Sequence, residues 1–186
     1  MIAHNLDQLK AFEAAITAYD YLIDHLPSTH PWSMRLRVQR IIAQLATHRL
    51  TDADEGLRRM RPKTTEMMDA TTCAALRLAA LIQQVRTYHW SDAAASAADL
   101  LGDLRPLGVE AGYGHALLAL SYHHLADAPP SDGALSTDAQ PTTAAEADKM
   151  ARLWWSRATV LLPAPVLVDR FPELGALASQ DVDGPP

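Results

Sequence analysis

The stretch ARLWWSRATVLLP, residues 151–163, decides the fold of this chain. Ala151, Trp155 and Ala158 stand four and three residues apart, so they lie on one stripe of a helix. Pro163 follows five residues later and ends the helix, because its ring blocks further helical hydrogen bonding. Two small residues beside one large aromatic residue suit a helix that approaches a second helix closely.

The same spacing of four, three and five residues recurs along the chain. Its other copies are Ala15-Tyr19-Leu22-Pro27, Ala94-Ala98-Leu101-Pro106 and the degenerate Leu50-Asp54-Leu57-Pro62. A helical stripe that ends in a proline, repeated several times, is typical of stacked helix pairs. The spacing therefore predicts a repeated helical unit, although the four prolines are 35, 44 and 57 residues apart rather than evenly placed.

Apolar residues at three- and four-residue steps indicate helices along most of the chain. We predict helices over residues 6–25, 31–48, 51–61, 64–88, 91–104, 110–126, 143–163 and 165–178, the last interrupted near Pro172. No segment alternates apolar and polar residues between turn residues, as strands do. The expected fold is therefore all-α, with about seven or eight helices.

Capping residues mark several helix starts. Thr143 and Glu146 have the spacing of a capping box, in which each side chain bonds the backbone of the other. Thr51 is expected to cap the short third helix, and Ser91 or Asp92 to cap the fifth, because their side-chain oxygens can accept a first-turn N–H.

The chain is expected to form one helical domain over residues 1–178. Residues 127–142 contain Pro129, Pro130 and Gly133 and almost no large apolar side chain, so they are expected to form a mobile loop. Residues 179–186 are expected to be a disordered tail.

Composition excludes several classes of protein. A net charge of −6 argues against a general nucleic-acid binder, which needs a surplus of lysine and arginine. No apolar run approaches the ~20 residues of a membrane helix. The N-terminus lacks the pattern of a signal peptide, and one cysteine, Cys73, cannot form an internal disulfide. We therefore expect a cytoplasmic protein without a membrane or nucleic-acid partner.

The helix pairs resemble tetratricopeptide repeats. In that family an alanine, an aromatic residue, a second alanine and a proline mark the second helix of each unit, as in residues 151–163. Leu118, Ala119 and Tyr122 are similar to the pattern of the first helix. The resemblance implies an α-solenoid of stacked antiparallel helix pairs; an irregular helical bundle is the alternative.

In such a stack the first helix of each pair lines a concave groove. The resemblance places six candidate partner-binding residues there: Arg35, Gln39, Gln83, Arg86, His123 and His124. The paired lysines and asparagines of the subtype that clamps a carboxylate are not found at the expected places.

Charge is uneven along the chain. Residues 33–63 hold eight basic and three acidic residues, a charge of +5 that leaves −11 for the remainder. One interpretation is a solvated helix face; the other is an arginine-lined surface for an acidic peptide or phosphate, since guanidinium groups bind such anions in bidentate fashion.

Chemical motifs do not favour catalysis. The chain contains no nucleophile elbow, phosphate-binding loop or dinucleotide fingerprint. No two histidines stand at the i, i+4 step that suits zinc on a helix, and the neighbours His123 and His124 point about 100° apart. We expect no cofactor, no metal and no enzymatic activity.

Three functions remain open. The first is an adaptor or scaffold that binds a protein or peptide through its groove, for which the arginines favour an acidic partner. The second is a subunit of a homo-oligomeric or hetero-oligomeric complex, such as a homodimer, that uses an exposed apolar end. The third is a helical small-molecule sensor or enzyme. Trp90 and Trp154 are expected to pack in the core, and their exposure would instead indicate a partner contact.

Overall fold

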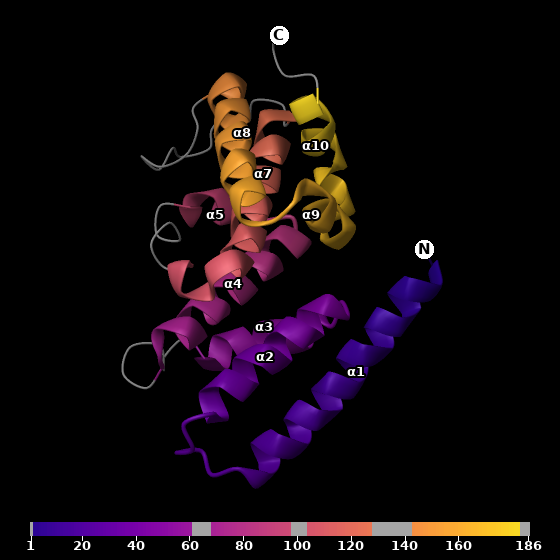
Figure 1. Cartoon of the computed structure of the whole chain (residues 1–186). Coiled ribbons are helices and arrows are strands. Elements are labelled where there is room, and N and C mark those ends of the chain that lie inside the picture. Colours follow the sequence, from indigo (N-terminus) through magenta and orange to yellow (C-terminus); the bar gives the residue numbers. More distant parts are fainter. Residues whose placement is uncertain (1, 61–67, 98–103, 128–142, 183–186) are drawn as a thin grey trace. The chain divides into compact units, whose positions relative to one another are not determined.

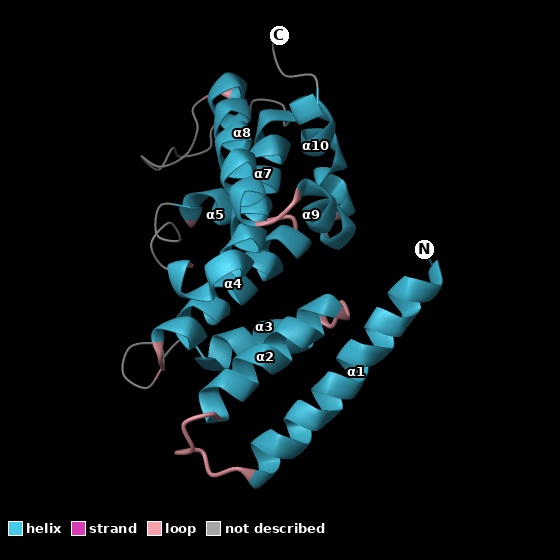
Figure 2. Cartoon of the chain, in the orientation of Figure 1, coloured by secondary structure: helices cyan, strands magenta, loops and turns pink. Residues whose placement is uncertain are grey.

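A computed structural model describes residues 2–60, 68–97, 104–127 and 143–182 (Figure 1). Within these ranges there are nine α-helices and two short 3-10 helices, and no strand (Figure 2). The all-α prediction is confirmed. The chain divides into two compact units, an N-terminal unit of residues 1–83 and a C-terminal unit of residues 84–186.

The N-terminal unit consists of α1 (Ile2–His25), α2 (Ser33–Ala46), α3 (Leu50–Met60) and most of α4 (Ala70–Arg86). In sequence order, α1 packs on α2 and α2 on α3. The buried stripe of α2 is the one that its periodicity predicts, with Met34, Val38, Ile41 and Leu45 inside. Gly56 allows α3 to approach α2, since a Cβ atom there would lie 2.7 Å from Ile41 Cγ1.

The C-terminal unit is arranged around α7 (Ala111–Asp127). This helix packs on α5 (Trp90–Ala95), on the 3-10 helix η2 (Arg105–Glu110), on α8 (Ala144–Leu161) and on the 3-10 helix η3 (Pro172–Leu174). α9 (Ala164–Arg170) and α10 (Gly175–Val182) complete the unit. Residues 116–122 are all buried, as expected of a central helix that is apolar on every side.

The stripe of α8 packs as its spacing predicts. Ala151, Trp155 and Ala158 are all buried, and α8 ends at Leu161, two residues before Pro163. On the facing helix, a Cβ atom added to Gly112 would lie 3.0 Å from the Leu162 side chain, so glycine permits this close approach.

The capping box at the start of α8 is confirmed. Thr143 Oγ1 accepts the N–H of Glu146 at 3.2 Å, and the Glu146 carboxylate accepts the N–H of Thr143 at 3.2 Å.

The other copies of the spacing differ from α8. In α1 the helix ends before Pro27 as predicted, but Leu22 is 39% exposed, because α2 covers only one side of α1. Pro106 lies inside η2 rather than directly after a helix. Pro62, Ala98 and Leu101 lie outside the described residues.

Most predicted boundaries agree with the structure to within a few residues. The fifth helix is an exception: α5 ends at Ala95 rather than near residue 104, and residues 98–103 are not described. The start predicted for the fourth helix, residue 64, lies outside the described residues, as does all of the predicted loop 127–142 except Asp127, which ends α7. α10 continues to Val182, four residues into the predicted tail, and residues 183–186 are not described.

Candidate functional site

Two helix-to-helix turns in the chain have the same hydrogen bonds. The Gln44 carbonyl accepts the N–H of Arg49 at 2.9 Å and the Thr47 hydroxyl at 3.1 Å. Forty residues later, the Gln84 carbonyl accepts the N–H of His89 at 2.9 Å and the Thr87 hydroxyl at 3.2 Å. A bond from the N–H of a residue to the carbonyl five positions earlier is the signature of a Schellman motif.

Each turn places a side chain in the left-handed backbone region. His48 has a φ of 59° and Tyr88 a φ of 61°, where glycine is the usual residue. The next helix then begins two residues later, at Leu50 and at Trp90. The predicted caps Thr51 and Ser91 or Asp92 are therefore wrong: the helices start earlier, and the carbonyls of Arg49 and His89 accept the first helical bonds, from Ala53 and Ala93.

This repeat is visible in the sequence once the turns are known. Residues 44–53, QLATHRLTDA, and residues 84–93, QVRTYHWSDA, share glutamine, threonine, aspartate and alanine at matching positions. The spacing of prolines did not reveal it, because the repeated signal lies in the turn between two helices rather than after the second one.

An aromatic cluster extends from the second turn. Tyr88 is 77% exposed, and its ring meets Trp90 edge-on with centroids 5.7 Å apart. Trp90, half-buried at the start of α5, stacks on His124 of α7 with centroids 4.1 Å apart and planes 18° apart. The backbone turn thus presents a tyrosine on a support of two stacked rings.

The two adjacent histidines of α7 occupy different settings. His123 Nε2 lies 3.6 Å from an Asp127 carboxylate oxygen, and the two histidine rings are 6.1 Å apart. Burial lowers the pKa of His124, the charge of His123 lowers it further, and the carboxylates of Asp127 and Glu173 oppose the shift. His124 therefore favours the neutral form that stacks on Trp90.

A second histidine of α7 faces a tryptophan of α8. His115 and Trp154 have centroids 5.3 Å apart, and the guanidinium of Arg157 lies 4.9 Å from the centroid of the same indole ring. Trp154 is buried, as the sequence predicts. Burial is the main cause that lowers the pKa of His115; a hydrogen bond to the backbone of Arg157 opposes the shift, and the positive charge of Arg157 adds to it.

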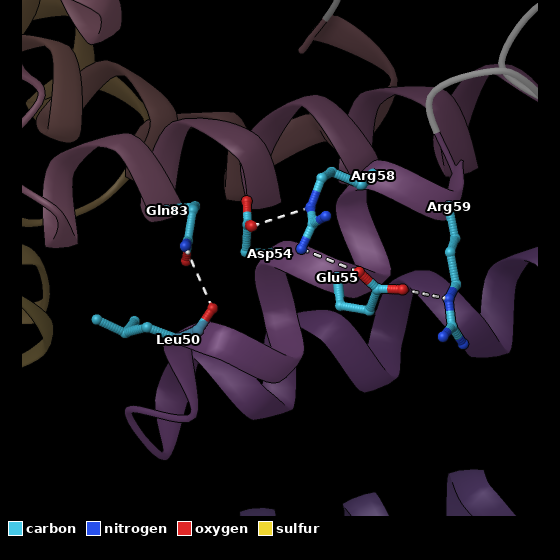
Figure 3. A network of polar contacts seen from close by, with 6 residues as sticks. All are labelled: Leu50, Asp54, Glu55, Arg58, Arg59 and Gln83. Carbon is cyan, nitrogen blue, oxygen red and sulfur yellow. Dashed lines mark hydrogen bonds and ion pairs between the residues drawn. The ribbon is translucent and has the colours of Figure 1, made fainter.

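The six predicted partner-binding residues are divided between the two units. Arg35 and Gln39 lie on α2, exposed and half-buried respectively. Gln83 donates a hydrogen bond of 3.3 Å to the Leu50 carbonyl, so it ties α4 to the start of α3 (Figure 3). The C-terminal unit holds the other three, Arg86 at the end of α4 and the pair His123 and His124. Of the six, the structure brings His123 and His124 together, beside Trp90.

Much of the basic stretch is balanced by acidic neighbours. Arg40 of α2 pairs with Asp20 of α1 at 2.6 Å, and Arg49, in the turn before α3, pairs with Glu13 of α1 at 2.6 Å. These two ion pairs connect α1 to α2 and to the turn that follows α2.

Along α3, Arg58 pairs with Asp54 and Glu55, and Arg59 pairs with Glu55 (Figure 3). The charge of +5 therefore overstates the positive surface that residues 33–63 offer to an anion.

The described residues place no three histidine, cysteine, aspartate or glutamate side chains where they could hold a metal ion. Over the same residues, none of the helices combines the length and apolar character that crossing a bilayer requires. Comparison with protein-family models, with curated proteins and with solved structures finds no match to this chain.

Proposed function

We propose that this chain is a non-enzymatic adaptor of tetratricopeptide-like helix pairs that binds a protein or peptide through the aromatic surface of its second turn. One observation carries the proposal: the exposed ring of Tyr88 is fixed by a left-handed backbone turn and supported by Trp90 and His124. Tyrosine and tryptophan dominate binding hot spots.

The geometry suits Tyr88 to contact a partner, because the side chain is already largely ordered before binding. Binding costs free energy when flexible side chains are ordered, and tyrosine has only two side-chain torsions to fix. An exposed aromatic residue that already rests on a neighbouring ring loses little freedom when a partner covers it. The repeated turn supports the helix-pair architecture, because the same ten-residue pattern joins α2 to α3 and α4 to α5.

The test is affinity capture with purified chain and lysate of the source cells, followed by quantitative mass spectrometry. Tyr88→Gly removes the ring at a position where glycine suits the backbone, so we expect a folded variant that loses the partner. His48→Gly makes the same backbone change in the first turn and is the matched control, expected to keep the partner. Retention by both variants, or capture of nothing by the native chain, would contradict the proposal.

The predicted preference for an acidic partner is tested in the same assay. Arg35 is exposed on α2 and takes part in none of the ion pairs described above, so Arg35→Glu reverses a charge without breaking a described contact. If the partner is acidic and reaches α2, this variant captures less of it. Equal capture would restrict the contact to the aromatic surface.

A second candidate function is favoured by the outer face of α1. An exposed stripe without charged residues runs along this helix at three- and four-residue steps: Ala11, Ala14, Ala18, Tyr21 and Leu22. Small residues let two helices approach closely, so the stripe suits self-association into a homodimer or a place in a larger complex.

Light scattering coupled to size-exclusion chromatography tests this candidate. A dimer mass for the native chain and a monomer mass for Ala18→Arg would support it. Thr17→Arg adds the same charge on the adjacent polar face and is the matched control. A native chain that stays monomeric at high concentration would exclude a homodimer.

A further inference from the structure

Helix α7 contacts a tryptophan on each of two neighbouring helices, in both cases through a histidine. His124 stacks on Trp90 of α5, and His115 packs against Trp154 of α8. Trp154 is 1% exposed. His115 Nδ1 and Trp154 Nε1 are both buried, and neither has a hydrogen-bond partner among the described residues.

Protonation changes what His115 requires of its surroundings. A neutral imidazole has one N–H and one lone pair, whereas the protonated ring donates from both nitrogens. Protonated His115 would therefore present an N–H at Nδ1, where the described residues supply no acceptor. Its new charge would also repel Arg157, whose guanidinium lies against Trp154. Both costs arise in the packed state and disappear when water reaches the ring.

The groups around His124 act on its pKa in both directions. Its own helix contributes His123, which opposes a second positive charge, and Asp127, which favours it. The 3-10 helix η3 contributes the carboxylate of Glu173, and α5 contributes the uncharged ring of Trp90. The charged residues of η2, Arg105 and Glu110, are exposed. His115 faces the Arg157 guanidinium and no carboxylate among the groups that shift its pKa; the one opposing contribution is a hydrogen bond to the backbone of Arg157. His115 is therefore the primary site of the two.

We propose that the C-terminal unit is an acid-sensitive switch, in which protonation of His115, aided by His124, loosens Trp154 and Trp90 from α7. Histidine is the side chain suited to this, because it changes charge between pH 5 and 8. When Trp90 loosens, Tyr88 loses the ring that supports it. The exposed aromatic surface is thereby disrupted together with the contact between His115 and Trp154.

Site-resolved NMR of the full chain tests the switch, without requiring a partner. The four tryptophans give four indole N–H resonances, assigned by single Trp→Phe variants. Between about pH 7.5 and about pH 5 we expect the Trp154 and Trp90 resonances to shift together with the ring signals of His115 and His124. The resonance of Trp32, in the N-terminal unit, reports on its own neighbour His30, with ring centroids 6.1 Å apart, so it should behave alike in the native chain and in His115→Gln.

Two variants separate the switch from general acid sensitivity. His115→Gln keeps a polar side chain that cannot be protonated, and it should abolish the shift of Trp154. Arg157→Gln keeps the histidine and removes the repelling charge, so the His115 ring should titrate at higher pH. His25→Gln, in the N-terminal unit, is the control and should behave as the native chain.

The proposal is overturned if the Trp154 resonance of the native chain does not move over this range, or if His115→Gln keeps the full shift. Should His115→Gln fail to fold, Arg157→Gln decides, since an unchanged titration midpoint of His115 would show that the guanidinium does not act on it.

Discussion

The imidazole of His124 lies almost parallel to the indole of Trp90, with centroids 4.1 Å apart. This stack fixes α5, a helix of six residues, against the end of α7. A helix of that length is not stable alone in water, so its tertiary contacts must hold it. The stack also makes the support of the exposed Tyr88 dependent on the charge of one histidine.

Replacing His124 by glutamine should reduce the acid sensitivity of the fold. The pKa of His124 is lowered in the folded protein, so the unfolded chain binds the proton more readily. The stability that neutral His124 contributes is present above the pKa of the unfolded chain, about 6.5, and is lost as the pH falls toward the lowered pKa of the folded protein. Thermal unfolding between pH 7.5 and 5 should show a smaller decrease in melting temperature for His124→Gln than for the native chain. Identical pH profiles would contradict this assignment.

Tyr122→Phe should loosen α5 with little other effect. The buried Tyr122 hydroxyl donates a hydrogen bond of 3.2 Å to the Ala94 carbonyl, a direct polar tie between α7 and α5. Its loss should cost about 1 kcal/mol, because the carbonyl loses its buried partner while the ring still packs. Urea denaturation gives the change, and hydrogen exchange should show faster opening in residues 93–97. A change confined to distant amides would argue against the bond.

The left-handed position of Tyr88 predicts opposite effects for two substitutions. Tyr88→Gly removes a steric penalty of about 1 kcal/mol, partly offset by the lost contact with Trp90, so stability should change little or rise. Tyr88→Val places a β-branched residue where φ is positive and should destabilise by about 1–2 kcal/mol. Chemical denaturation of the pair checks the order, and a valine variant as stable as the glycine variant would contradict it.

The start of α8 depends on its capping box. Thr143→Ala removes the acceptor of the Glu146 N–H, so we expect a loss of about 1 kcal/mol. Thr143→Ser keeps the hydroxyl and should restore most of it. Denaturant midpoints of the three chains give the comparison; equal loss in the serine variant would point to packing of the threonine methyl group instead.

The small residues of α8 are expected to be intolerant of larger ones. Ala158 is fully buried, so Ala158→Leu forces additional methylene groups into a packed core and should cost about 1–3 kcal/mol or more. Val160 is 82% exposed two positions later, and Val160→Leu, the control, should be nearly neutral. If Ala158→Leu were as stable as the native chain, α7 and α8 would have to move apart at little cost in free energy.

Much of the fold follows from local sequence. The stripe of α8, the capping box at Thr143 and the helix ends before Pro27 and Pro163 are all predicted correctly, because each depends on residues within a few positions of one another. The caps at Thr51 and Ser91 were predicted wrongly, since a Schellman turn at the end of the preceding helix determines where the next helix begins.

The candidate site was predictable only in part. Sequence placed His123 and His124 among the exposed residues of a first helix, yet His124 is stacked against Trp90, which stands 34 positions earlier. Likewise, Arg49 belongs to the basic stretch of residues 33–63, but it pairs with Glu13, which stands 36 residues earlier.

The sequence by itself determined that the chain is helical, where most helices begin and end, and which face of α8 is buried, because periodicity and proline act within one helix. Only the tertiary structure decided which residues meet. It placed His115 on Trp154, paired Arg40 with Asp20 and left Leu22 and Tyr88 exposed. A helical pattern fixes the direction in which a side chain points, but the neighbour that it finds there depends on how whole helices pack.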